Sequence, residues 1–204
     1  MPASGPLGAL LRRVLLWLPV TFVVWYLTAA WHLTPVVWLA HQLLQFWLPD
    51  AVADLSLHQN ELLLITRFGE VGGRLVANPP PGENLGFLTN PLSYSYSLPL
   101  FAALALATPL RGRARRLVLG IGVLLLIELA SMLATQVKTL VFATGDAFVT
   151  QQKWGAPARD AVALAYQLGS LLLPMVMPLV VWMAGHGAYL GQLAPALRRN
   201  DSQG

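Results

Sequence analysis

Glu128 is the residue whose type and position most clearly suggest chemistry, because it is a single acid within a long apolar stretch. A carboxylate near the middle of a membrane-spanning helix is costly unless it is paired, protonated or hydrated. Ser131 and Thr135 follow Glu128 at helical spacing, so the three side chains share one polar face. This face predicts either a functional contact, such as a proton relay or a substrate contact, or a hydrogen bond between packed helices.

A second candidate contact lies in residues 90–99, which read NPLSYSYSLP and enter another apolar stretch with unusual polarity. The segment opens with Asn90, and we expect Tyr94 and Tyr96 to lie at the outer membrane interface, as tyrosines of an aromatic belt do. Pro99 has no amide hydrogen, so a backbone carbonyl early in the helix loses its partner. The segment is therefore either a contact site or an ordinary helix start at an interface.

Composition excludes several kinds of site. The chain has no cysteine, which excludes disulfides, thiolate metal sites and cysteine nucleophiles. Its histidines lack the spacing of a metal-binding pair, so we expect no metal ion, no other cofactor and no catalytic residue. The histidines are His32, His41, His58 and His186. We accordingly predict that the protein is not an enzyme.

Four apolar blocks position these residues. They cover about residues 14–33, 92–110, 117–137 and 166–184. Each block is close to the ~20 residues that a helix needs to cross a bilayer. We therefore predict an all-α transmembrane fold, a four-helix polytopic bundle that forms a single membrane domain over residues 1–204, with a kink in the fourth helix at its prolines.

Arginine clusters determine the expected orientation. Eight of the 13 basic residues flank the apolar blocks, and they are Arg12, Arg13, Arg111, Arg113, Arg115, Arg116, Arg198 and Arg199. Cytoplasmic loops of membrane proteins are enriched in Lys and Arg. Both termini are therefore expected on the cytoplasmic side, with residues 50–91 and 140–165 outside.

The first block admits a second interpretation, a cleavable secretory signal that ends at the small residues 28–30. The block is longer than a usual signal core, however, and it contains Trp17, Trp25 and Trp31. Such rings suit a helix that is retained at a membrane interface. We therefore interpret the block as a transmembrane helix.

The segments expected outside the membrane have their own patterns. Residues 35–49 are bounded by prolines and too short to span, which predicts either an interfacial helix or an extension of the first helix past a kink. Residues 61–68 and 74–78 flank a glycine-rich turn, which predicts a small β-hairpin or sheet within the extracytoplasmic loop 50–91. We expect this loop to offer a protein-binding surface, and residues 144–160 to be irregular.

The charge pattern favours a lipid bilayer as the principal partner. The net charge is +4, but the basic residues lie where anionic lipid headgroups would be, and no soluble segment carries a basic stripe. Nucleic-acid binding is therefore not predicted. Small residues such as Gly120 and Gly169 allow close helix packing, so the sequence is compatible with a homo-oligomer and with a complex with another membrane protein.

The order of these parts resembles the small membrane proteins associated with exosortase H. The resemblance covers most of the chain, and its sharpest motif is the junction NPLSYSYSLPL at residues 90–100. It implies an accessory protein of the bacterial inner membrane, beside an exosortase, a transpeptidase that processes carboxy-terminal signals of exported proteins. Exosortases use a membrane-embedded cysteine, which this chain lacks, so the chain is not expected to be the transpeptidase itself.

Two hypotheses of function follow. The leading one is a non-enzymatic accessory protein whose outer loop contacts the sorting transpeptidase or its exported substrate. The alternative is a small proton-coupled transporter or channel that uses Glu128. The resemblance implies no catalytic residues, so a contact role for Asn90, Tyr94, Tyr96, Pro99 or Glu128 is our own hypothesis.

Overall fold

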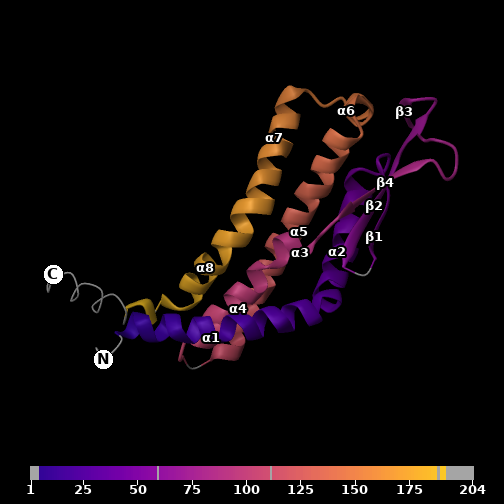
Figure 1. The fold of residues 1–204 in the computed structure, drawn as a ribbon. Coiled ribbons are helices and arrows are strands. Elements are labelled where there is room, and N and C mark those ends of the chain that lie inside the picture. Colours follow the sequence, from indigo (N-terminus) through magenta and orange to yellow (C-terminus); the bar gives the residue numbers. More distant parts are fainter. Residues whose placement is uncertain (1–4, 59, 111, 188, 192–204) are drawn as a thin grey trace. The chain divides into compact units, whose positions relative to one another are not determined.

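The computed structural model describes residues 5–58, 60–110, 112–187 and 189–191. Arg111, Arg198 and Arg199 of the predicted cytoplasmic clusters lie outside the described residues. The chain is mostly helical and contains a small antiparallel sheet. Its elements in Figure 1 are α1 (Pro6–Leu27), α2 (Ala29–Trp47), β1 (Val52–His58), β2 (Glu61–Val71), β3 (Arg74–Ala77), β4 (Asn84–Thr89), α3 (Leu92–Ser95), α4 (Ser97–Ala107), α5 (Arg113–Ala143), α6 (Asp146–Gln152), α7 (Ala156–Gln167), the π-helix η1 (Leu168–Leu172) and α8 (Leu173–Gly185).

These elements form two compact units, which are described separately. Unit 1 comprises Met1–Leu27, Tyr96–Leu125 and Met175–Gly204, and unit 2 comprises Thr28–Ser95 and Leu126–Pro174. The long helix α5 contributes its first part to unit 1 and the remainder to unit 2. The candidate residues are consequently distributed over both units.

Among the described residues, three helical segments are long and apolar enough to cross a membrane: Pro6–Leu27, Arg113–Ala143 and Ala156–Gly185. The last of these is formed by α7, η1 and α8. The prediction of several apolar helices that could span a membrane is confirmed, but the count of four is not confirmed within the described residues. The block predicted at about 92–110 forms the shorter apolar helix Leu92–Ala107.

The second block yields a short helix because local chemistry determines both of its ends. The Leu92 amide donates to Asn90 Oδ1 at 2.9 Å, a side-chain cap just before α3, with Pro91 between the cap and the first residue of the helix. At the other end Thr108 is extended, with φ −86° and ψ 119°. A residue that precedes proline, here Pro109, favours this conformation.

The first block, predicted over residues 14–33, is divided between two helices. Thr28 leaves the helical conformation, with φ −99° and ψ 12°, and separates α1 from α2. The segment predicted as an interfacial helix, residues 35–49, therefore forms the larger part of α2 and does not simply continue α1. Apolar residues lie on both sides of Thr28, so hydropathy does not mark this break.

Strand β2 is the centre of the sheet in unit 2. Leu62 pairs with Leu57 of β1 and also with Thr89 of β4, so β1 and β4 flank β2 on opposite edges. β3 pairs with the far end of β2 through a two-residue turn at Gly72 and Gly73. Both glycines have positive φ, 59° and 77°, as such a tight hairpin turn requires.

The predicted β-hairpin is thus part of a four-stranded antiparallel sheet. The sequence interpretation ended the sheet at about residue 78 and omitted β4. Gly86 interrupts the apolar residues of β4, and its neighbours alternate between exposed and partly buried, which weakens the strand signal.

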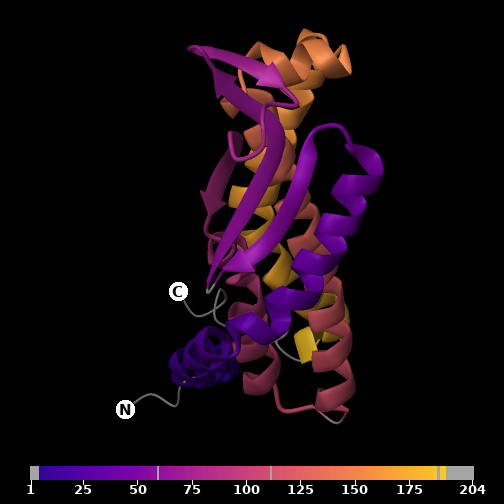
Figure 2. The same ribbon diagram turned by 90° about the vertical axis from the view of Figure 1, so that its right-hand side faces the viewer.

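Helix α2 covers the β1 side of the sheet, as both ribbon views show (Figures 1 and 2). Leu33 and Leu44 of α2 are fully buried, as are Leu62 and Leu64 of β2. Burying a leucine side chain contributes roughly 1.5–3 kcal/mol, so the helix and the sheet share one hydrophobic core.

The segment predicted to be irregular, residues 144–160, contains α6 and the start of α7, so that prediction was wrong. Phe148 of α6 is fully buried, and its ring lies edge-on to Phe68 at 6.2 Å and to Trp154 at 5.2 Å. These aromatic contacts attach α6 to the sheet. Tertiary packing therefore stabilises a helix that is too short to be evident in the sequence.

In unit 1, α1 lies against α4, and α4 approaches the first part of α5 closely. A Cβ at Gly120 would collide with the ring of Phe101, so only glycine permits this contact. Trp182 Nε1 of α8 donates a 3.0 Å hydrogen bond to Thr108 Oγ1 at the end of α4. This hydrogen bond joins α8 to the end of α4 at Thr108, where the backbone is no longer helical.

Candidate intramembrane polar site

Glu128 is the middle residue of the 31-residue helix α5, which is long and apolar enough to span a membrane. Its side chain is only 1% exposed, and neither carboxylate oxygen has a hydrogen-bond partner among the described residues. An unpaired charge at this position costs several kcal/mol. Nothing in the local geometry offsets that cost.

The neighbouring hydroxyl groups do not solvate Glu128. Ser131 Oγ donates to the Ile127 carbonyl at 2.9 Å, and Thr135 Oγ1 donates to the Ser131 carbonyl at 2.8 Å. Both hydrogens are therefore used within α5, as is common for hydroxyl side chains in apolar helices. Only the lone pairs of these oxygens remain, and these do not stabilise a carboxylate.

Tyr94 of α3 is a buried group with a donor that is complementary to a carboxylate. Its side chain is 2% exposed, and its hydroxyl also lacks a hydrogen-bond partner among the described residues. Tyr94 lies close enough to Glu128 for the two groups to interact electrostatically. The structure therefore brings together two unsatisfied polar groups from elements that are far apart in sequence.

The π-helix η1 is the third element at this site. A Cβ at Gly169 would lie 3.2 Å from Ser131 Cα, so η1 approaches the backbone of α5 directly, and it also contacts α3. The wide π-helical turn ends two residues before Pro174, whose ring would clash with the Ser170 carbonyl in a regular helix. Single wide turns of this kind are frequent at functional sites.

Gln136 is a buried polar residue that the sequence interpretation omitted. Its Nε2 donates to Thr89 Oγ1 at 3.2 Å, which joins α5 to the end of β4, while Oε1 has no partner among the described residues. The sequence did contain a signal for Gln136, since its side-chain amide directly follows Thr135 in a largely apolar helix. Gln136 extends the buried polar face of α5 toward the sheet.

The structure brings together only some of the predicted contact residues. Tyr94, Glu128, Ser131 and Thr135 belong to unit 2, as does Asn90, which caps α3. Tyr96 is the half-buried residue between α3 and α4 and, with Pro99, belongs to unit 1. Pro99 lies in the first turn of α4, where its missing amide hydrogen costs little.

The described residues contain no group of three or more histidine, aspartate or glutamate side chains that could hold a metal ion. Glu128 and Tyr94 thus form a polar pair in an apolar setting. A carboxyl group and a phenol hydroxyl are complementary in hydrogen bonding, but the two groups are not hydrogen-bonded to each other in this arrangement.

Comparison with known proteins identifies the family. The model of the exosortase H-associated membrane proteins matches residues 4–188 of the chain. The chain belongs to this family. No curated protein and no solved structure matches it. The match covers nearly all of the described residues, including the sheet, the polar site and all three helical segments that could span a membrane.

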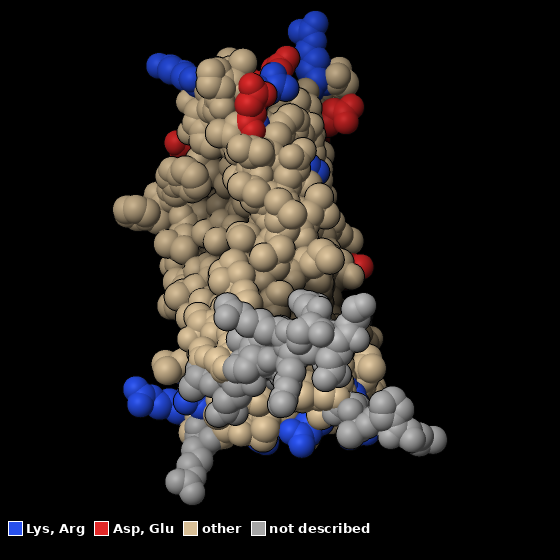
Figure 3. Space-filling view, turned by 90° about the vertical axis from the view of Figure 1, so that its left-hand side faces the viewer, with Lys and Arg blue, Asp and Glu red and all other residues tan. Residues whose placement is uncertain are grey.

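As an exosortase-associated membrane protein, the chain has the apolar surface that its family description implies. Large apolar side chains are exposed along the helices that could span, among them Leu15, Val118, Leu126, Leu171 and Met175. Uncharged side chains also form most of the face shown in Figure 3. Such surfaces are compatible with a lipid environment.

This family member has a second buried polar group in unit 1, directly after the last segment that could span. His186 donates from Nδ1 to the Trp182 carbonyl at 2.8 Å, and the two rings are stacked. Burial lowers the pKa of His186 below its ordinary value of 6.5, the hydrogen bond opposes this shift, and the charge of Arg116 adds to it. The folded chain therefore favours the neutral imidazole.

Proposed function

We propose that the protein is a non-enzymatic accessory subunit of an exosortase-type sorting system in the bacterial inner membrane. The observation that carries this proposal is the family match over residues 4–188, since that family is described as exosortase-associated. The helices that could span supply the membrane anchor. The accessory subunit contacts the transpeptidase or the exported substrate on which the transpeptidase acts.

Both units contribute to this proposed role. Unit 2 carries a folded sheet, and such a surface can hold a polypeptide partner outside the bilayer. The segment 90–99 leads from the sheet into the apolar helices, so Tyr94 and Tyr96 are proposed as contacts near the interface. Glu128 interacts electrostatically with Tyr94 and is proposed to adjust the position of α3 rather than to touch a partner directly, because it is buried.

The proposed orientation places both termini in the cytoplasm. It is supported by Arg12 and Arg13 within α1 and by Arg113, Arg115 and Arg116 at the start of α5. Because the chain has no cysteine, single cysteines introduced at Arg115 and Arg74 can be labelled selectively in intact cells. A membrane-impermeant maleimide should label the cysteine at position 74 and not the one at 115; the reverse pattern would refute this orientation.

Affinity purification tests the proposed function. The tagged protein is coexpressed with the exosortase of the same bacterium, extracted in a mild detergent and recovered on the tag. An unrelated polytopic membrane protein expressed at the same level serves as the control. Selective recovery of the exosortase is expected, whereas equal recovery of both proteins would reject the proposal. The family match gives no support to the transport alternative.

A further inference from the structure

Strand β1 is an outer strand of the sheet, and helix α2 satisfies part of its free edge. His41 Nδ1 lies 3.2 Å from the Leu55 amide nitrogen and 3.0 Å from the Leu55 carbonyl oxygen, so it accepts from the first or donates to the second according to its tautomer. Gln45 Nε2 donates to the Ala53 carbonyl at 3.2 Å. Side chains of α2 thus replace a neighbouring strand along this part of β1.

Leu57 is the next residue of β1 whose backbone faces the same edge. Leu55 pairs with Leu64 and Leu57 pairs with Leu62, so the two residues have the same orientation in the β1–β2 ladder. Leu55 turns its amide and carbonyl toward His41, away from β2, and Leu57 must therefore do the same. No described side chain binds the Leu57 backbone groups as His41 binds those of Leu55.

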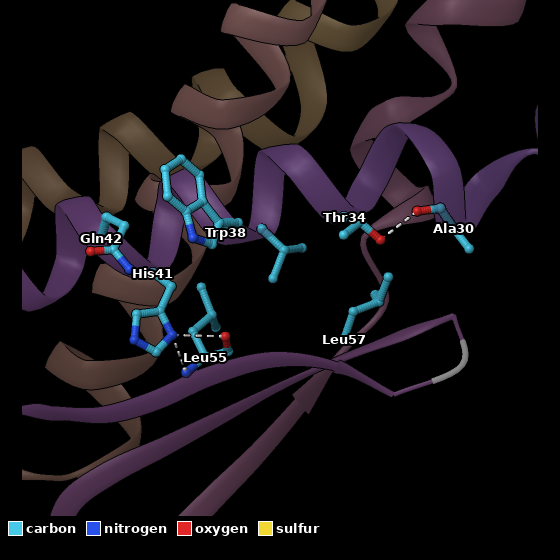
Figure 4. Close-up of a pocket in the computed structure, with 8 residues that line it drawn as sticks. Ala30, Thr34, Trp38, His41, Gln42, Leu55 and Leu57 are labelled. Atoms are coloured by element: carbon cyan, nitrogen blue, oxygen red, sulfur yellow. Dashed lines mark hydrogen bonds between the residues drawn. The ribbon is translucent and has the colours of Figure 1, made fainter.

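An open groove lies at this unsatisfied end of the strand edge (Figure 4). Its volume is about 470 Å³, and it is lined on one side by α2 and on the other by Leu55 and Leu57 of β1. The α2 wall includes Thr34, whose hydroxyl donates to the Ala30 carbonyl at 2.6 Å, and Trp38, which is 64% exposed. The groove therefore combines apolar walls with a strand edge that has a free donor and acceptor.

We propose that this groove binds an extended segment of the exported substrate, which adds to the β1 edge at Leu57. An extended polypeptide is the ligand that satisfies a strand edge, because its backbone supplies an alternating donor and acceptor, while its side chains enter apolar pockets at every second residue. In the proposed orientation the sheet lies outside the bilayer, on the side that an exported substrate reaches, whereas the spanning helices of a transpeptidase satisfy their own backbone groups within the bilayer. The tail of an exported protein is the partner that can arrive extended. This inference rests on the proposed function, because that function supplies the substrate.

Disulfide crosslinking can reveal the backbone conformation of the bound segment. Thr34→Cys places the only cysteine of the chain in the groove, and Leu43→Cys places it elsewhere on the same helix, at a residue that does not line the groove. The probe is an exported protein with a carboxy-terminal sorting signal, coexpressed in a series of variants that carry a single cysteine at successive positions of the tail. Crosslinks are formed with a mild oxidant in native membranes and quantified on gels.

Strand addition predicts strong crosslinks to Thr34→Cys at every second tail position, at least tenfold above those to Leu43→Cys. A repeat of three to four positions would show a docked helix and would overturn the proposal, as would equal yields at both sites or crosslinks between two copies of the chain only. Recovery of the exosortase in the affinity purification together with any of these negative results would reject the groove alone and leave the proposed function intact.

Leu57→Pro provides a second test, because it removes the outward amide hydrogen but no hydrogen bond of the β1–β2 ladder. It should reduce the alternating crosslinks to Thr34→Cys at least tenfold. Unchanged crosslinks would refute strand addition. Filling the groove with Ala30→Trp should reduce them as strongly without any change in the strand backbone, and retained crosslinks in that variant would also contradict the proposal.

Discussion

Gly169 of η1 lies so close to Ser131 of α5 that a Cβ at position 169 would be 3.2 Å from Ser131 Cα. The neighbouring atom belongs to the backbone, so it cannot move aside as the end of a flexible side chain could. This contact holds the π-helix against the polar face that includes Glu128. It makes the geometry of the polar site sensitive to the volume of a single residue.

Gly169→Val should therefore destabilise the protein by about 1–3 kcal/mol, the usual cost of inserting excess volume into a packed site. Gly122→Val is the matched control, since a Cβ at Gly122 would meet no atom within 4 Å apart from its own stretch of helix backbone and its chain neighbours. Thermal unfolding in detergent, followed by circular dichroism, measures both effects. Equal melting temperatures for the two variants would contradict the close contact.

Glu128→Gln should leave the melting temperature unchanged or raise it. The variant keeps the shape of the side chain, replaces a buried ionisable group with a neutral one and breaks no hydrogen bond, because the carboxyl group has none among the described residues. Thr135→Val provides a comparison, since it removes the hydrogen bond to the Ser131 carbonyl. A marked loss of stability in Glu128→Gln would show that the carboxylate has a partner that the described contacts do not include.

Trp182→Phe should lower stability by about 0.5–1.5 kcal/mol, the net contribution of one hydrogen bond, because Thr108 Oγ1 loses its indole donor. The control is Trp31→Phe, at a residue that is 86% exposed. Differential scanning fluorimetry in detergent can compare the two variants. The interpretation fails if the exposed tryptophan proves the more costly to replace.

The free energy of unfolding should also decrease as the pH falls below about 6.5, the ordinary pKa of histidine. Because the folded-state pKa of His186 is lowered, the folded chain binds fewer protons than the unfolded chain. The contribution of His186 is therefore complete above about pH 6.5 and is lost progressively as the pH decreases. Melting temperatures measured from about pH 8 to about pH 5 should fall in the wild type and less steeply in His186→Asn. An equally steep fall of the melting temperature with pH in the wild type and in His186→Asn would refute this contribution of His186.

The sequence was informative where residue patterns act locally. The apolar blocks predicted helices that could span, and the glycine-rich turn at Gly72 and Gly73 predicted a hairpin. The short second helix was not foreseen, because its limits depend on the Asn90 cap and on the extended Thr108 before Pro109, rather than on hydropathy.

The polar site was only partly predictable for a different reason. Periodicity placed Glu128, Ser131 and Thr135 on one helical face, as the structure of α5 shows. The proximity of Tyr94 to Glu128 and of Gly169 to Ser131 depends on contacts between elements far apart in sequence. Hydropathy along a single chain carries no information about such pairs.

The central claim is that this membrane protein contacts an exosortase or its exported substrate. It is tested most directly by a photoreactive residue placed at Tyr96, activated in cells that express the sorting system, with the captured molecule identified by mass spectrometry. A photoreactive residue at Leu15, on an exposed apolar face of α1, is the control. We predict adducts with the exosortase or a substrate that carries the sorting signal from Tyr96, at a yield above that from Leu15. Capture of lipid alone from both positions would contradict the claim.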